Sequence, residues 1–360
     1  MAEYIASDAD KELHIVNLKS LEDEARKIIP QGAFGYIQGG AGDEWTMRRN
    51  EAAFEDRRIA PRVLADLEKP DMRTSILGID LPSPVILSPA AAHGLCHVEG
   101  EAATARGVAG AGSIMCISTY ANTTIEETAK AGSGAPQWFQ LYMSKDDEFN
   151  FFLLDKAKNN GARAIILTAD ATVGGNREDD IINGFTFPLP MANLAQFGQG
   201  KGQGIGDIYA KALQKIKPAD IEKIASHSGL PVIVKGIQSP EDAAVAISAG
   251  AAAVYVSNHG GRQLDGGPGS FDVLESIAAA VGGRVPLIFD SGIRRGQHVF
   301  KALACGADVV GINRPVLYAL ALGGAKGVTS VFRHLNKELA MVMQLAGTRD
   351  IQAVKRAKLL

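Results

Sequence analysis

The sequence contains few cysteines and few aromatic residues. Only 6% of its 360 residues are aromatic, and its three cysteines are Cys96, Cys116 and Cys305. They are odd in number, far apart and without the spacing of paired thiols, so the sequence supports neither a disulfide framework nor a zinc site. We expect three reduced thiols that are mostly packed in the interior.

An excess of charge and long apolar runs are also missing. The 37 basic and 40 acidic residues give a net charge of −3, without the basic footprint of a nucleic-acid-binding protein. No stretch reaches the ~18 uninterrupted apolar residues that span a bilayer, and residues 1–20 are too polar for a signal peptide. We therefore predict a cytoplasmic protein with no nucleic-acid or membrane partner.

What the sequence does contain is a series of eight short apolar runs. They are continuous rather than alternating, which is typical of parallel strands covered on both faces. The runs are residues 84–89, 113–118, 137–142, 163–170, 231–236, 252–257, 285–292 and 308–313.

Alanine-rich segments with helical character separate most of these runs. Eight strand–helix units predict an α/β fold, a (β/α)8 TIM barrel, and make the whole chain, 1–360, a single domain. Within it we expect an N-terminal helical segment over about 1–80 and the barrel over about 81–325. A C-terminal helix and tail, with the helix from about Val328, should occupy about 326–360.

One interval is about twice as long as the others. It follows the fourth strand, and we predict a lid over about 171–217, because long loops in compact domains often act as lids. Its glycine-rich stretch, residues 198–206, neither follows a strand nor opens a convincing helix, so we assign it to a mobile lid rather than to a phosphate-binding loop.

Residues that follow the strands should converge at one end of the barrel, where TIM barrels carry their active sites. The loops after strands seven and eight commonly bind phosphate, and here they contain Gly292, Arg294 and Arg314. Arginine suits this task because its planar guanidinium pairs with phosphate through two hydrogen bonds. Arg295 fits either a phosphate site or a surface position.

Two further strand ends carry groups for catalysis. Lys235 ends an apolar strand, so its ammonium should point into the barrel mouth, either to form a Schiff base or to stabilise an anionic cofactor. His259 is suited to accept a proton near neutral pH, and Arg262 beside it is suited to hold a carboxylate. Gly260 and Gly261 between them allow a sharp turn.

Six motifs, in order and in compatible spacing, carry a family resemblance. They are "FGYIQGGAGDEWT", "WFQLYMSKD", "LTADATVGGNRE", "PVIVKG", "SNHGGRQLDGGP" and "FDSGIRRGQHVFKALACGADVV". From about residue 15 to the C-terminus, the chain resembles the FMN-dependent L-2-hydroxy acid oxidase family, above all its bacterial members that act on L-lactate.

The resemblance implies a role for each matching residue. His259 is similar to the base that accepts the substrate hydroxyl proton, Asp170 to the carboxylate that orients it, and Lys235 to the cation beside the flavin; Tyr142 completes the catalytic set. The expected substrate-binding residues are Tyr36, Tyr142, Arg177, His259 and Arg262. The expected FMN-binding residues are Ala90, Ala91, Ser118, Gln140, Thr168, Lys235, Ser257, Asp290, Ser291, Gly292, Arg294, Asn313 and Arg314.

Four positions have separate consequences for the cofactor and the substrate. The family usually has glycine where this chain has Asn313, and a side chain there would crowd the phosphate or need a positive φ, which puts FMN affinity in question. Phe187 stands in the lid where some relatives carry tyrosine, so a hydroxyl is lost. Arg295 lies outside the cofactor in the family, and Ala91 occupies the position of a small residue above the flavin that leaves room for dioxygen.

The function implied is FMN-dependent oxidation of L-lactate to pyruvate, with O2 reduced to H2O2, by a homotetramer that needs no metal. The alternatives are oxidation of glycolate or a longer 2-hydroxy acid, and a dehydrogenase that uses another electron acceptor. A non-redox phosphate-binding barrel isomerase and a non-catalytic flavin-binding scaffold are the remaining hypotheses. The former would not need His259, Arg262 and Arg177 around a carboxylate.

Overall fold

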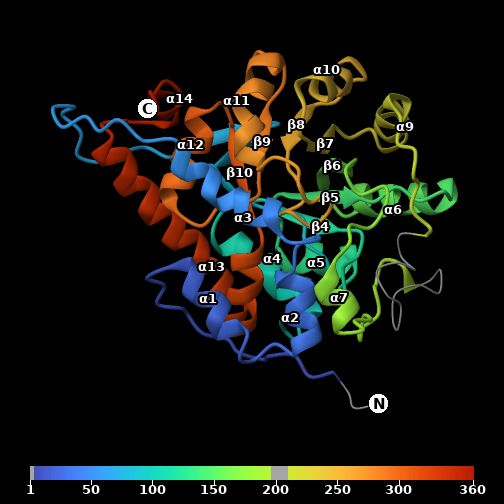
Figure 1. The fold of residues 1–360 in the computed structure, drawn as a ribbon. Helices are drawn as coiled ribbons and strands as arrows, with labels where there is room; N and C mark the ends of the chain where they lie inside the picture. Colours follow the sequence, from blue (N-terminus) through green and yellow to red (C-terminus); the bar gives the residue numbers. More distant parts are fainter. Residues whose placement is uncertain (1–3, 196–209) are drawn as a thin grey trace.

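Eight short, almost wholly buried strands run parallel to one another at the centre of the molecule (Figure 1). The computed structural model describes residues 4–195 and 210–360. In chain order the strands are β3 (Val85–Leu87), β4 (Met115–Ser118), β5 (Gln137–Leu141), β6 (Ala162–Thr168), β7 (Val232–Ile237), β8 (Ala253–Val256), β9 (Leu287–Phe289) and β10 (Val309–Ile312). All eight coincide with the predicted apolar runs.

The sheet closes on itself. Its order is β3-β10-β9-β8-β7-β6-β5-β4, and the two ends meet where the Leu87 amide donates to the Ile114 carbonyl at 3.1 Å. A parallel bridge between Ala90 and Ile117 continues this contact. The predicted TIM barrel is therefore confirmed, and its fourth strand is β6.

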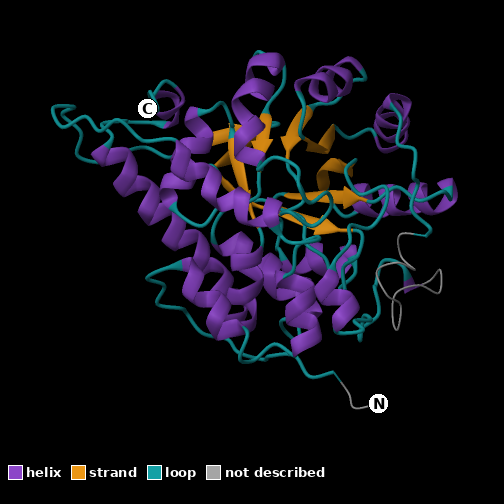
Figure 2. Ribbon diagram, viewed as in Figure 1, coloured by secondary structure: helices purple, strands orange, loops and turns teal. Residues whose placement is uncertain are grey.

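Helices surround the strands on the outside of the barrel (Figure 2). Their starts follow simple capping chemistry: Thr124 and Glu127 form a capping box, and Ser239 caps the helix that begins with Pro240. The helices after the strands are α4 (Gly100–Gly110), α5 (Ile125–Ala131), α6 (Asp147–Asn159), α9 (Pro218–Ser228), α10 (Pro240–Ser248), α11 (Ser270–Val281), α12 (Gly296–Ala304) and α13 (Arg314–Leu345).

The segment before the barrel is only partly helical. It contains α1 (Leu18–Ala25), α2 (Gln31–Gln38), α3 (Trp45–Ala52) and the 3-10 turn η1 (Ala53–Asp56). It also contains an antiparallel hairpin, β1 (Thr74–Ile76) and β2 (Ile79–Leu81), that the sequence did not predict. Three-residue strands give too little pattern to recognise, but their Ile76, Ile79 and Leu81 pack with the residues inside the barrel.

The last long helix begins earlier than predicted. α13 starts at Arg314, directly after the last strand, and is broken at Gly323 and Gly324. Gly324 has φ +57°, and a Cβ there would lie 2.4 Å from the Ala9 carbonyl oxygen, so the break requires glycine at this position. By length and composition α13 could span a bilayer, but 78% of its most apolar 18-residue stretch is buried inside the protein. It packs on α1, α4 and α12. The short α14 (Ile351–Lys355) follows it.

Part of the long insertion after β6 packs on the barrel. It forms α7 (Glu178–Ile182), and Phe187, Met191 and Leu194 beyond it are buried. The glycine-rich residues 198–206 lie outside the described residues. The lid thus stays a prediction.

Candidate active site

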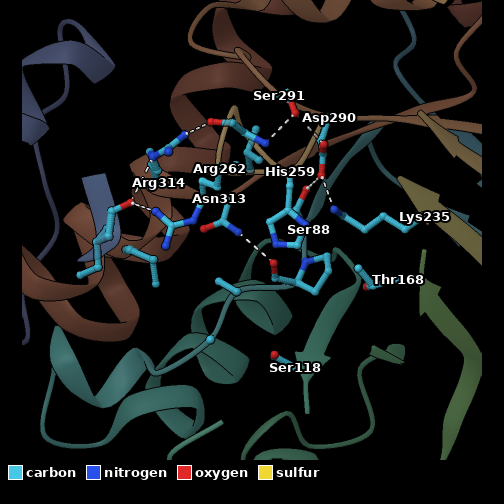
Figure 3. A pocket seen from close by; sticks show the side chains of 18 of the residues that line it. Ser88, Ser118, Thr168, Lys235, His259, Arg262, Asp290, Ser291, Asn313 and Arg314 are labelled. Carbon is cyan, nitrogen blue, oxygen red and sulfur yellow. Dashed lines mark hydrogen bonds and ion pairs between the residues drawn. The ribbon is translucent and has the colours of Figure 1, made fainter. Parts of the chain in front are cut away.

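A cavity opens at the carboxyl ends of the barrel strands (Figure 3). It encloses an empty volume of about 990 Å³, counting its part open to solvent. The predicted site residues that line it are Tyr36, Ala90, Ala91, Ser118, Tyr142, Thr168, Arg177, Lys235, His259, Arg262, Asp290, Ser291, Gly292, Arg294, Asn313 and Arg314. Asp170, Gln140 and Ser257 do not line it, but each hydrogen-bonds a residue that does.

His259 is held by a left-handed turn and a carboxylate. Its φ is +60°, and Gly260 and Gly261 continue in the same region. At Gly261, φ is +74° and a Cβ would lie 2.6 Å from the Met47 Cα, so the turn requires glycine. The turn brings His259 Nδ1 to 3.1 Å from Asp170 Oδ1.

Burial and neighbouring charges set the protonation of this pair. Burial lowers the pKa of His259 below its usual value, although Asp170 opposes this. Burial alone would raise the pKa of Asp170, but its interactions with His259, which include a hydrogen bond, and the charge of Lys235 hold that pKa below its usual value. A neutral imidazole that donates from Nδ1 to an ionised Asp170 leaves Nε2 free to accept a proton at neutral pH.

Two arginines, the buried Arg177 and the partly buried Arg262, lie beside the histidine. The Arg177 Nε donates to the Arg262 carbonyl oxygen at 3.4 Å, and an Arg262 NH group donates to the Gly39 carbonyl at 2.7 Å. The Arg262 guanidinium also lies 5.1 Å from the ring centroid of Tyr36. Burial, with the charge of Arg177 adding to it, lowers the pKa of Arg262 to about 10. Two such cations in one cavity favour an anionic ligand between them.

Two tyrosines form a wall next to the base. The Tyr142 hydroxyl lies 3.1 Å from His259 Nε2. Its ring stacks on Tyr120, with centroids 4.7 Å apart and planes 11° apart. Tyr120 lines the cavity and was missed in the sequence, although it stands two residues beyond Ser118 at the end of the second predicted strand.

Lys235 lies deep in the cavity and is 3% exposed. Its Nζ donates to Ser257 Oγ at 2.9 Å and lies 4.0 Å from Asp290 Oδ2. That carboxylate oxygen also accepts a hydrogen bond from Ser88 at 3.0 Å. Ser88 was missed as well, and its position at the end of the first predicted strand was the available signal. Its ion pair and its hydrogen bond account for the position of Lys235 without a Schiff base.

Three predicted FMN contacts form one buried row. Ser118 Oγ donates to Gln140 Oε1 at 3.1 Å, and Gln140 Nε2 donates to Thr168 Oγ1 at 2.9 Å. The row crosses β4, β5 and β6, so it depends on the register of three adjacent strands. Gln140 thereby orients the two hydroxyls that face the cavity.

The opposite end of the cavity carries the predicted phosphate residues. Arg314 donates to the carbonyls of Ile37, Gly39 and Gly260, and Arg294 pairs with Glu51 at 3.3 Å.

The loop after β9 shapes this end. Gly292 has φ +86°, and a Cβ there would lie 2.1 Å from the Asn50 carbonyl oxygen, so only glycine fits. Arg295 does not line the cavity; it pairs with Glu338 at 2.9 Å, in agreement with a structural role.

Asn313 does not require a left-handed backbone. Its φ is −140°, so the alternative of a positive φ is wrong. Its amide nitrogen donates to the Pro89 carbonyl at 3.0 Å, joining the end of β10 to the loop after β3. Phe187, the other departure, is buried edge-on against Tyr36, with ring centroids 5.0 Å apart.

The residues present fit FMN. The cavity has cations and a glycine turn at one end for a phosphate, a buried Lys235 at the other for negative charge on the ring, and a small apolar wall at Ala90 and Ala91. Within residues 4–195 and 210–360, no group of three or more His, Cys, Asp or Glu side chains could hold a metal ion.

Comparison with known proteins agrees with this geometry. The family model described as FMN-dependent dehydrogenase matches residues 25–360. The chain is 60% identical to an L-lactate oxidase from Lentilactobacillus hilgardii, over 99% of this chain and 97% of that protein. It is 38% identical to glycolate oxidase 3 of Arabidopsis thaliana, over 96% of this chain and 95% of that protein.

Solved structures show the same relationship. Lactate oxidase from Pediococcus acidilactici superposes with a TM-score of 0.96 at 60% identity, covering 99% of this chain and 98% of that one. A mandelate oxidase superposes with a TM-score of 0.90 at 36% identity, covering 96% and 99%. The chain therefore belongs to the FMN-dependent dehydrogenase family, and its cofactor is FMN.

Proposed function

We propose that this protein oxidises L-lactate to pyruvate and reduces O2 to H2O2. The observation that carries the proposal is the convergence of a histidine and two arginines in one cavity, with a carboxylate hydrogen-bonded to the histidine. The similarity to L-lactate oxidases over nearly the whole chain supports lactate as the substrate. Lactate loses two electrons and two protons, and dioxygen takes up both, so the reaction balances without another reactant.

Substrate binding is the task of the arginine pair. Arg177 and Arg262 would hold the lactate carboxylate, which offsets the cost of burying two guanidinium groups side by side. The Tyr36 ring beneath Arg262 would fix the direction of that guanidinium. This anchoring places the carbon that carries the hydroxyl next to His259.

Proton removal is the task of His259. Its Nε2 would accept the hydroxyl proton of lactate, while Asp170 at Nδ1 stabilises the imidazolium that results. The Tyr142 hydroxyl, 3.1 Å from Nε2, would donate to the substrate oxygen and orient it. FMN, when bound, supplies the acceptor for the two electrons.

Cofactor binding divides between the two ends of the cavity. Lys235 would face the ring, held by Ser257, and Ser118 and Thr168 would be the polar contacts of the ring, oriented by Gln140. Asp290 and Ser291 would bind the sugar chain, and Gly292, Arg294, Asn313 and Arg314 the phosphate. Ala90 and Ala91 would leave space above the ring, and a small side chain at Ala91 admits dioxygen.

The proposal is tested on the purified protein. The protein should be yellow, and L-lactate added without oxygen should bleach it faster than glycolate or L-mandelate at the same concentration. Admission of oxygen should restore the colour and yield H2O2 and pyruvate. Faster bleaching by another acid would assign that substrate instead, and bleaching without reoxidation by O2 would make the protein a dehydrogenase. A colourless protein that binds no added FMN would refute the proposal.

We also propose that the single-domain protein acts as a homotetramer in the cytoplasm. Ile181 and Ile182 on α7 and Val63 and Leu64 in the loop before β1 are exposed apolar residues, which are common at interfaces between subunits. The composition supports neither a nucleic-acid nor a membrane partner. Light scattering during size-exclusion chromatography measures the mass, and a monomer would contradict the tetramer.

A further inference from the structure

Two buried hydroxyl groups lie in a row that runs from inside the barrel, at Tyr255, to the wall of the cavity, at Ser88. The hydroxyl of Tyr255 on β8 lies 2.8 Å from Ser88 Oγ, and Ser88 Oγ lies 3.0 Å from Asp290 Oδ2. Ser88 gives its single proton to the carboxylate, so Tyr255 is the donor to Ser88. Figure 3 shows Ser88 and Lys235 approaching Asp290 from different sides.

Gly311 on β10 makes room for this row. A Cβ at position 311 would lie 2.1 Å from Ser88 Oγ and 2.3 Å from the Tyr255 hydroxyl. Tyr255 belongs to the apolar cluster inside the barrel, with Ile86 and Ile288 among its members, and the Lys235 ammonium lies 5.6 Å from the centroid of its ring. Burying hydroxyls among apolar side chains costs free energy unless they are hydrogen-bonded. Here the Tyr255 hydroxyl donates to Ser88, and Ser88 donates to Asp290.

The same carboxylate oxygen faces Lys235. Asp290 Oδ2 is 4.0 Å from Lys235 Nζ, beyond hydrogen-bond distance, while it accepts the proton of Ser88. The ammonium donates to Ser257 instead. Ser291 donates to the other carboxylate oxygen, Oδ1, at 3.0 Å, so both oxygens of Asp290 are held by serine hydroxyls.

We propose that Tyr255 and Ser88 are positioning residues that hold Asp290 back from Lys235 and so leave the Lys235 charge available to bound FMN. This inference rests on the proposed function. Without the Ser88 hydroxyl, Asp290 Oδ2 is free to hydrogen-bond the ammonium directly. A closer anion lowers the positive potential at the cofactor, and the negative charge that FMN gains on reduction becomes less stable.

Burial and the charge of Asp290 raise the pKa of Tyr255 well above its usual value. Tyr255 therefore keeps its proton throughout the working pH range and remains a donor.

The test compares two variants of the FMN-loaded protein. Ser88→Ala removes the link to Asp290, and Tyr255→Phe removes only the hydroxyl behind it. The reduction potential of bound FMN, measured against reference dyes without any lactate, should fall in Ser88→Ala and fall less in Tyr255→Phe. The shift in the double variant should be smaller than the sum of the two single shifts, because the Tyr255 hydroxyl is hydrogen-bonded to Ser88 and acts on Asp290 mainly through it. The rate of flavin reduction by L-lactate should fall in the same order.

Matched controls delete similar groups elsewhere. Ser228→Ala removes a buried serine hydroxyl that donates within α9, and Tyr4→Phe removes a tyrosine hydroxyl that donates to the Leu95 carbonyl. Both should leave the potential unchanged. A merely structural role for Ser88 would lower thermal stability without moving the potential of the FMN that stays bound.

Two results would overturn the inference: an unchanged or raised potential in Ser88→Ala, or shifts that simply add in the double variant. If Ser88→Ala fails to fold, Tyr255→Phe still tests the inference, since an unchanged reduction potential in Tyr255→Phe would show that its hydroxyl does not act on Asp290 through Ser88. Failure of the proposed function looks different, because the unaltered protein would then not bind FMN or would not be reduced by L-lactate.

Discussion

His259 Nδ1 and Asp170 Oδ1 lie 3.1 Å apart although 89 residues separate them in the chain. Asp170 follows β6, and His259 follows β8, so the barrel brings together two loops that have β7 between them. The contact fixes the orientation of the imidazole and points Nε2 at Tyr142. This arrangement gives the base its direction.

His259→Gln should retain FMN and lose most flavin reduction by L-lactate. A positioned general base contributes roughly 10²- to 10⁴-fold to the rate, and glutamine cannot accept the proton. Anaerobic stopped-flow absorbance measures the bleaching, with His14→Gln at an exposed site as the control. Rapid bleaching of His259→Gln would refute the assignment of the base.

Arg177→Lys and Arg262→Lys should each raise KM for L-lactate although the charge is kept. Lysine offers a point charge and cannot reproduce the planar, two-pronged contact with a carboxylate. Steady-state oxygen consumption measures the change. Arg295→Lys, at an arginine that pairs with Glu338 outside the cavity, should leave KM unaltered. Normal kinetics in both cavity variants would show that the two arginines do not bind the substrate carboxylate.

Asn313→Gly should weaken FMN binding by at most about tenfold. The change deletes the hydrogen bond from the Asn313 amide to the Pro89 carbonyl, which holds the loop after β3 in place beside the phosphate residues, and the typical net contribution of such a bond, about 0.5–1.5 kcal/mol, is an upper bound on the loss. Fluorescence titration of the apoprotein with FMN gives the dissociation constant. Tighter binding by the glycine variant would show that the asparagine crowds the phosphate instead.

The apoprotein should lose stability as the pH falls from about 6.5 to about 4. Burial of His298 lowers its pKa from the usual 6.5 to about 4, and its ring stacks on Phe54 with centroids 4.4 Å apart. In this window the unfolded chain binds a proton at His298 that the folded chain does not, so His298 destabilises the fold by up to about 3 kcal/mol at low pH.

Urea unfolding at several pH values checks this prediction. His298→Gln should reduce the difference in unfolding free energy between pH 7 and pH 4.5, whereas His14→Gln at an exposed site should leave it unchanged. An equal pH dependence in the His298 variant and the unaltered protein would show that other groups cause the acid sensitivity.

Much of the fold and site could be predicted from local patterns. Eight apolar runs, too continuous for a half-exposed sheet, required burial on both faces and therefore a parallel barrel. Catalytic side chains at strand ends, such as those of Lys235 and His259, were therefore expected to lie close together at one end of the barrel. The hairpin that closes the barrel floor was missed because strands of three residues carry too little periodicity, and Tyr120 was missed because a single aromatic residue past a strand has no distinctive neighbours.

The sequence by itself determined the barrel, the end of the barrel where the site lies and the residue types available for FMN and a carboxylate, because these depend on order and spacing along the chain. Tertiary structure decided which groups meet. The distance between Asp290 and Lys235, the stacking of Tyr120 on Tyr142 and the fit of two hydroxyls over Gly311 depend on the register and closure of strands far apart in the chain. No local pattern encodes such distances, since they result from the packing of the whole barrel.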